Sequence, residues 1–192
     1  MTSGDWTVFS GKFNTPTGTT AQYLRGDGSL ATFPTIPTTY KSTTDTTAVT
    51  GNTNNNKVAS LLIAANTLST GSIINIKARV GKTGGAGITT LRVYINTADS
   101  IVTPAPTLIM TSATSTIAQL YNGIDRTAVV KSATNTQTAQ ATASIQNDAV
   151  VGNATLTASN IDWTQNQYLI FAIQNGAAGD STVLSYYQIE LR

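Results

Sequence analysis

The sequence contains neither cysteine nor histidine. Without these residues the chain has no disulfide, no thiolate nucleophile, no histidine metal ligand and no imidazole base. Charged residues are also scarce: they make up 10% of the chain, against about 25% in an average soluble domain. These absences exclude most enzyme mechanisms and predict a surface that is polar and nearly neutral.

The few charges are scattered and almost balanced. Eleven Lys and Arg residues stand against nine acids, for a net charge of +2, and no basic run occurs. Cations so few and so dispersed would release few counterions from a phosphate backbone, so we expect no nucleic-acid partner. No apolar stretch approaches the roughly 18 residues that span a bilayer, and the first residues lack the pattern of a secretion signal. We therefore expect synthesis in a cytoplasm and no membrane insertion.

The residues that are present favour β-structure. Threonine makes up about one residue in five, and β-branched residues favour strands. No segment carries a 3.6-residue apolar stripe, whereas two-residue alternation recurs between Gly or Asn turns at intervals of roughly 8–12 residues. The pattern predicts an all-β chain, an antiparallel β-sandwich of jelly-roll type. The expected strands are residues 58–64, 72–80, 88–96, 107–113, 116–121, 127–132, 136–145, 160–163, 168–174 and 182–191.

Two of these strands alternate most clearly, residues 72–80 and residues 88–96. We expect them to pair as a hairpin through the glycine-rich residues 81–87. A Gly-Lys-Thr triplet at 81–83 matches the end of a P-loop, but Ile76 stands where the motif needs its first glycine, so we expect a polar loop. The expected inward faces are Ile74, Ile76, Ala78 and Val80 in the first strand and Leu91, Val93 and Ile95 in the second.

The last two expected strands, 168–174 and 182–191, carry apolar side chains on both faces. An antiparallel sheet usually keeps one face in contact with water, so this pattern has two explanations. Either each strand is central and covered within its own chain, or one face is buried by a neighbouring copy.

Composition divides the chain in two. Residues 1–41 hold three of the five prolines and several glycines but no sustained apolar alternation, so they cannot build a core of their own. We expect residues 1–41 to form an extended N-terminal arm and residues 42–192 to form the sandwich domain. The Thr- and Asn-rich segment 42–57 predicts an edge strand or a linker.

A motif in the expected arm carries a specific resemblance. Its residues are Gln22, Tyr23, Leu24, Arg25, Gly26, Asp27 and Gly28, preceded by Gly-Thr at 18–19. This run resembles GTxxQYLRGDGTW, a motif found near the N-termini and along the shafts of bacteriophage fibre proteins. Ser29 and Leu30 replace its usual Thr-Trp. Residues 64–71, 74–84, 94–97 and 166–171 are similar to the β-sandwich heads of short phage fibres.

The resemblance implies a homotrimeric structural protein on the exterior of a bacteriophage virion. Residues 22–28 would join the copies and anchor the arm to capsid or tail proteins, and the heads would point outward to bacterial surface glycans. Three copies about an axis would pack Tyr23 and Leu24 and pair Arg25 with Asp27 across chains. A short chain with one head domain fits a head fibre best, with a tail fibre or receptor-binding tip as the alternative.

Few residues suggest chemistry. Tyr94 and Tyr121 face outward in the expected register and are candidates for surface binding. We expect no catalytic residue, no metal site and no cofactor, because the acids are spread singly and no nucleophile motif or calcium loop appears. Two alternatives stay open. One is a polysaccharide depolymerase whose carboxylates meet at the trimer seam, and the other is integrin-type adhesion through Arg25-Gly26-Asp27. The depolymerase candidates are Asp99, Asp125, Asp148 and Asp162.

Overall fold

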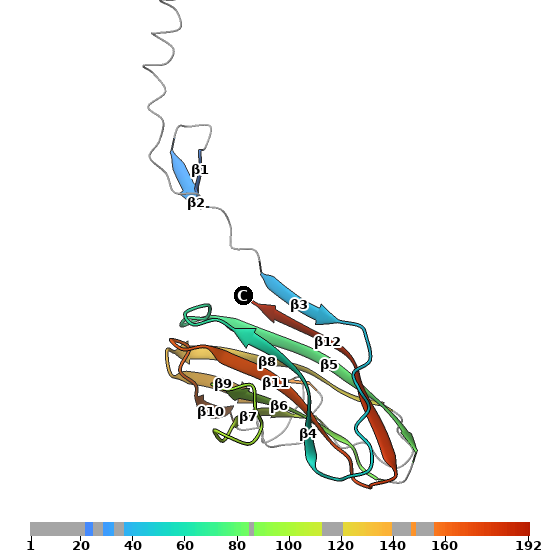
Figure 1. Cartoon of the computed structure of the whole chain (residues 1–192). Helices are drawn as coiled ribbons and strands as arrows, with labels where there is room; N and C mark the ends of the chain where they lie inside the picture. The colour runs from blue at the N-terminus through green and yellow to red at the C-terminus, as the bar shows by residue number, and fades with distance from the viewer. Residues whose placement is uncertain are drawn as a thin grey trace, which may run out of the picture. The chain divides into compact units, whose positions relative to one another are not determined.

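A computed structural model describes residues 22–24, 29–32, 37–84, 87–112, 121–139, 147–148 and 156–192 of the chain. These residues form twelve β-strands (Figure 1), which confirms the predicted all-β class. None of the residues in these ranges belongs to a helix long and apolar enough to cross a membrane. The chain divides into two compact units, residues 1–36 and residues 37–192.

The first unit contains a short antiparallel hairpin. Strand β1 (Gln22–Leu24) pairs with β2 (Leu30–Thr32), and Tyr23 lies opposite Ala31. The sequence that joins them contains Gly26, Asp27 and Gly28, which are turn-forming residues. Residues 1–21 and 25–28 lie outside the described residues. Within the expected arm, residues 22–24 and 30–32 are therefore paired with each other.

The second unit is the predicted antiparallel β-sandwich. One sheet has six strands in the order β10-β9-β8-β5-β12-β3, and the other has four in the order β4-β11-β6-β7. Every strand pairing within both sheets is antiparallel. The strands are β3 (Thr38–Ser42), β4 (Asn55–Ile63), β5 (Ile73–Gly84), β6 (Thr90–Asn96), β7 (Thr107–Thr111), β8 (Tyr121–Ser132), β9 (Asn135–Ala139), β10 (Leu156–Asn160), β11 (Gln167–Gln174) and β12 (Asp180–Leu191).

The core lies between the two sheets. Both predicted inward rows are buried: Ile74, Ile76 and Val80 have no exposed surface on one side, and neither do Leu91 and Val93 on the other. Full burial of one such side chain contributes roughly 1.5–3 kcal/mol. The two-residue alternation therefore identified correctly which side chains turn inward.

The predicted hairpin of residues 72–80 and 88–96 is wrong. Strand β5 pairs with β8 and β12, whereas β6 pairs with β11 and β7 in the opposite sheet. The two strands therefore belong to different sheets. Alternation identifies the buried face of a strand but not the strand beside it.

The loop predicted at residues 81–87 is also partly wrong. Strand β5 continues through Gly84, and the Lys82 side chain turns into the protein, with only 4% of the residue exposed. Val183 and Thr182 of β12 lie opposite Gly81 and Lys82, so pairing with the long last strand extends β5 beyond the apolar residues.

The sandwich begins earlier than the predicted boundary at residue 42. Strand β3 (Thr38–Ser42) pairs with β12, with Tyr40 opposite Ile189, and the compact unit begins at Pro37. Within the segment 42–57, Val49 forms a single bridge with Thr182, and β4 starts at Asn55. Edge pairing rather than composition decides where the domain starts.

Candidate functional site

A shallow groove lies on the outer face of the six-stranded sheet, and it contains one of the two predicted binding tyrosines. Its volume is about 280 Å³. Tyr121 stands at the start of β8 with 70% of its surface exposed. The groove is lined by Ala78, Arg79, Tyr121, Asn122, Gly123, Ile124, Asp125 and Asn147.

One of the residues that line the groove, Gly123, carries no side chain. Gly123 lies opposite Arg79 in the neighbouring strand, on the face that points away from the core. A Cβ atom built on Gly123 would lie 2.6 Å from the carbonyl oxygen of Ala78. Because β5 and β8 approach so closely, only glycine fits there without displacement, and the Arg79 side chain is left uncovered on that side.

Two charged side chains line the groove, and only one of them has an ion-pair partner among the described residues. Asp125 pairs with Lys77 at 3.4 Å, whereas the Arg79 guanidinium forms no ion pair with any residue of the described ranges. Tyr186 of β12 lies opposite Arg79 on the other side and donates its hydroxyl to the Gln188 side chain at 2.8 Å. An exposed ring next to a guanidinium suits a ligand with both an apolar face and acceptor oxygens, as sugars have.

Tyr94, the second predicted binding tyrosine, lies on the opposite sheet. It is half-buried on the outer face of the four-stranded sheet, and its hydroxyl accepts a hydrogen bond from Asn55 Nδ2 at 2.8 Å. Tyr94 and Tyr121 therefore do not form one site. Tyr94 belongs instead to a surface that we call the apolar face, made of Leu62, Tyr94, Leu108, Tyr168, Ile170 and Ala172.

The apolar face accounts for the double-sided pattern of residues 168–174. Leu169, Phe171 and Ile173 belong to the core, while Ile170 and Ala172 point the other way and are nevertheless fully buried within a single chain. Their strand β11 is central, between β4 and β6. Beside them Leu62 stays 46% exposed, so the periphery of the face contacts water.

The four carboxylates considered for hydrolysis all have structural partners. Asp99 binds Lys57 at 2.6 Å and Asp125 binds Lys77. The Lys57 hydrogen bond, helped by Ser60, holds the pKa of Asp99 below its ordinary value. The Thr164 hydroxyl and backbone N–H do the same for the pKa of Asp162. A glycosidase acid needs a raised pKa, so Asp99 and Asp162 are unsuited to that role.

Asp148 is tied to a buried arginine. Arg126 Nε lies 3.1 Å from Asp148 Oδ1, and the Thr127 backbone N–H donates to Oδ2 at 2.6 Å. The Arg126 side chain has no exposed surface. Asp148 thus compensates a buried cation. Across the described ranges, no group of three or more acidic side chains is placed to hold a metal ion.

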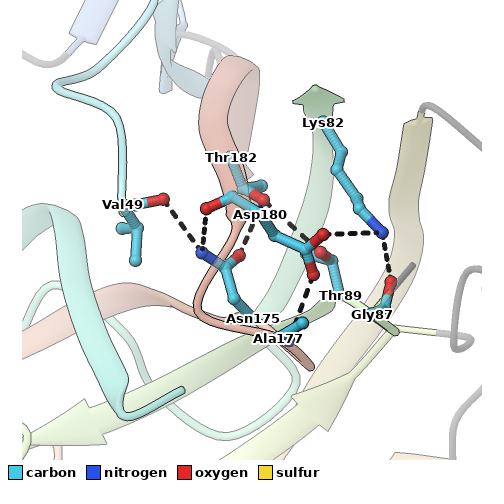
Figure 2. Close-up of polar contacts among 8 residues, drawn as sticks. All are labelled: Val49, Lys82, Gly87, Thr89, Asn175, Ala177, Asp180 and Thr182. Carbon is cyan, nitrogen blue, oxygen red and sulfur yellow. Dashed lines mark hydrogen bonds and ion pairs between the residues drawn. The ribbon is translucent and has the colours of Figure 1, made fainter. Parts of the chain in front are cut away.

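A second polar cluster, which sequence reasoning missed, is buried at one end of the sandwich (Figure 2). Lys82 Nζ lies 3.4 Å from Asp180 Oδ1 and donates a hydrogen bond to the Gly87 carbonyl oxygen. The Ala177 N–H donates to Asp180 Oδ2 at 3.2 Å. The side chains of Lys82 and Asp180 are 2% and 0% exposed.

Asn175 fixes the backbone around this ion pair. Its Nδ2 donates to the carbonyl oxygens of Val49 at 2.9 Å and of Asp180 at 3.3 Å. Its Oδ1 accepts a hydrogen bond from the Thr182 hydroxyl at 2.7 Å (Figure 2). In the sequence, Lys82 and Asp180 stand at positions that continue the inward-facing alternation of their strands. Because lysine and aspartate are seldom buried, this alternation did not predict that their side chains lie in the interior.

The predicted anchoring residues fall in the first unit. Gln22, Tyr23 and Leu24 form β1. Arg25, Gly26, Asp27 and Gly28 lie outside the described residues, as does the integrin-type triplet that they contain, so their roles in trimer formation and anchoring stay predictions.

Comparisons with known proteins add little. No family model matches the chain, and no curated protein matches it. Among solved structures, the chain is similar to "Structure of infectious bursal disease virus Gt strain" (14% identity, TM-score 0.36) and "Crystal structure of infectious bursal disease virus VP2 subviral particle" (13% identity, TM-score 0.34). Each match covers 85% of this chain but only 35% and 34% of those chains. At these scores the likeness carries no functional argument.

Proposed function

We propose that the protein is a structural component on the exterior of a bacteriophage virion, a short homotrimeric fibre that attaches to host-surface glycans. The observation that carries the proposal is the difference between the outer faces of the two sheets. One sheet has an uncharged, largely apolar outer face, and the other has a shallow groove that contains an exposed ring and a guanidinium. The fibre motif of residues 22–28, in a separate unit, supports the anchoring role.

The apolar face supports self-association. It contains two tyrosines, two leucines and the buried Ile170, and none of the six residues that define it is charged. Charged and polar contacts lie beside it, as in the Lys57–Asp99 ion pair and the Arg92–Gln174 hydrogen bond at 2.5 Å. An uncharged aromatic centre with a polar rim is the usual anatomy of a protein interface. The cations nearest to the face, Arg92 and Lys57, lie opposite Ala172 in the neighbouring strands, and Gln174 and Asp99 bind them.

The groove beside Tyr121 supports the adhesive role. Binding by one shallow groove is weak, but three copies on one fibre, and many fibres on one particle, convert weak sites into strong attachment. Tyr121 would stack on the apolar face of a sugar ring, and Arg79 would donate to its oxygens. No enzymatic step is part of the proposal.

The test is the mass of the purified full chain in solution by multi-angle light scattering. A mass of three chains is the expected result, and a monomer at all concentrations would overturn the trimer. Electron microscopy of antibody-labelled particles tests the location separately. Label on the capsid supports a head fibre, label on the tail supports the alternative of a tail fibre or receptor-binding tip, and unlabelled particles would contradict the virion assignment.

A further inference from the structure

The buried Lys82–Asp180 pair joins two adjacent long strands. Lys82 is on β5 and Asp180 begins β12, where the backbone of Asp180 lies opposite Gly84. Both side chains turn toward the interior and have 2% and 0% of their surface exposed (Figure 2). Lysine and aspartate are seldom buried to this degree.

The surroundings exclude water from the carboxylate. A Cβ atom on Gly87 would collide with Asp180 Oδ2 and with the Ala177 nitrogen, so the backbone of Gly87 closes directly over the carboxylate. Gly176 is packed in the same way against Ile88. Glycines at 87 and 176 let the two loops press together, and the ion pair is enclosed beneath them.

The buried Lys82–Asp180 ion pair is costly to desolvate, and its hydrogen-bonding sites are not all filled. Burial of an ion carries a large desolvation cost, and a buried pair recovers this cost only when hydrogen bonds fill the remaining sites. Among the described residues, Asp180 Oδ1 accepts no hydrogen bond, and its partner there is the Lys82 ion pair. An amide between the two side chains would leave neither charge in the interior.

The positions of the atoms also suit amide formation. Lys82 Nζ, held by the Gly87 carbonyl, lies 3.4 Å from Oδ1, which is bonded to the Cγ atom that the amine would attack, and holding two reacting groups side by side favours their reaction. The Ala177 N–H points at Oδ2 from 3.2 Å. A backbone donor at that oxygen stabilises the negative charge that develops when a carbonyl carbon is attacked.

We propose that Lys82 and Asp180 condense into an intramolecular isopeptide bond. One proton passes from Nζ to Oδ1, and the neutral amine attacks Cγ to form the N–C bond, with charge on Oδ2 held by the Ala177 N–H. A second proton then passes from nitrogen to Oδ1, and the Cγ–Oδ1 bond breaks. The products are one amide and one water molecule, with no oxidation or reduction. Asn175 binds the backbone carbonyl oxygen of Asp180 beside the pair.

The experiment is high-resolution mass spectrometry of the purified full-length chain. The expected intact mass is lower than the sequence mass by one water molecule. Proteolysis should release a branched peptide that contains both Lys82 and Asp180, identified by fragmentation. Loss of water with a linear peptide that hydroxylamine cleaves at Asp180–Ser181 would reveal a succinimide instead and overturn the proposal.

Two variants complete the test. Lys82→Arg keeps the cation but cannot form this amide, so it should have the full sequence mass, while Lys131→Arg, at an exposed lysine on β8, should still lack one water. If Lys82→Arg does not fold, the wild-type peptide map decides alone. A full wild-type mass, with linear and unmodified peptides for Lys82 and Asp180, would show an ion pair only and refute the bond.

Discussion

Trp163 Nε1 donates a hydrogen bond to the Thr136 hydroxyl at 2.8 Å, with both residues buried. Thr136 belongs to β9 of the six-stranded sheet, whereas Trp163 lies in the turn that leads into β11 of the other sheet. The Trp163 backbone N–H also donates to the Ala133 carbonyl oxygen at 3.1 Å. Trp163 thus links β9 of the six-stranded sheet to the turn that precedes β11 in the four-stranded sheet.

Replacing Thr136 should therefore weaken the sandwich. Thr136→Val keeps the shape but removes the acceptor for a buried indole N–H, which costs about 1–3 kcal/mol of unfolding free energy. Thr136→Ser keeps the hydroxyl and loses only a methyl group, so it should be the more stable variant. Urea denaturation of both variants measures the difference. Equal stability, or a less stable serine variant, would show that the hydrogen bond contributes nothing.

The inward rows of the sheets were predictable, because apolar residues at every second position leave few choices of face. Strand β8 shows where this fails. Residues 116–121 and 127–132 are predicted as two separate strands, whereas β8 runs without a break from Tyr121 to Ser132. Its inward positions before residue 127 are Asn122, Ile124 and Arg126, all buried, and two of the three are polar. Polar side chains in a core are stabilised by distant groups, such as Asp148 for Arg126, and no local pattern records them.

The candidate site was predicted only in part, for a related reason. Alternation indicated that Tyr94 and Tyr121 both point outward, and this is correct for the sheets to which they belong. Their separation onto opposite sheets depends on strand order, which a single sequence does not determine. The groove itself depends on the close approach of Gly123 to Ala78, two residues distant in sequence.

Self-association should depend on the apolar face. Leu62→Lys places a charge at its exposed edge and should lower the mass in light scattering from three chains to one, because a buried unpaired charge opposes association. Leu156→Lys is the matched control. Leu156 is an exposed leucine at 68%, on β10 of the other sheet, and its variant should stay trimeric. A trimeric Leu62→Lys protein would exclude this face as the contact.

Adhesion should depend on the groove. Tyr121→Ala removes the stacking surface and Arg79→Gln removes the guanidinium, and each should reduce binding to host cells about tenfold or more when three sites act together. Lys131→Gln removes an exposed cation from the same strand and should bind like the wild type. Cell pull-down with labelled protein measures the three variants. If Lys131→Gln loses as much binding as Arg79→Gln, general charge rather than the groove is responsible.

The Lys57–Asp99 pair should give a measurable pH response. The pKa of Asp99 is lower in the folded protein than its ordinary value, chiefly because of the Lys57 hydrogen bond. Its contribution to stability is therefore present above the unfolded pKa and is lost as the pH falls through the folded pKa. In Lys57→Met, NMR titration should show the Asp99 pKa rising toward its ordinary value. The Asp162 pKa, lowered by Thr164, should not move, and a parallel shift there would indicate a global change instead.

Gly123 offers the sharpest test of the groove's construction. In Gly123→Ala the new methyl group would lie 2.6 Å from the Ala78 carbonyl oxygen, between two paired strands. The strands must separate to admit it, so the free energy of unfolding should fall by about 1–3 kcal/mol, as for other overpacked sites. Gly179→Ala is the control, because a Cβ atom there has no neighbour within 4 Å. That variant should stay within about 0.5 kcal/mol of the wild type. If both variants were equally stable, β5 and β8 would have room to spare, and the absence of a side chain at position 123 would need another explanation, such as access of a ligand to Arg79.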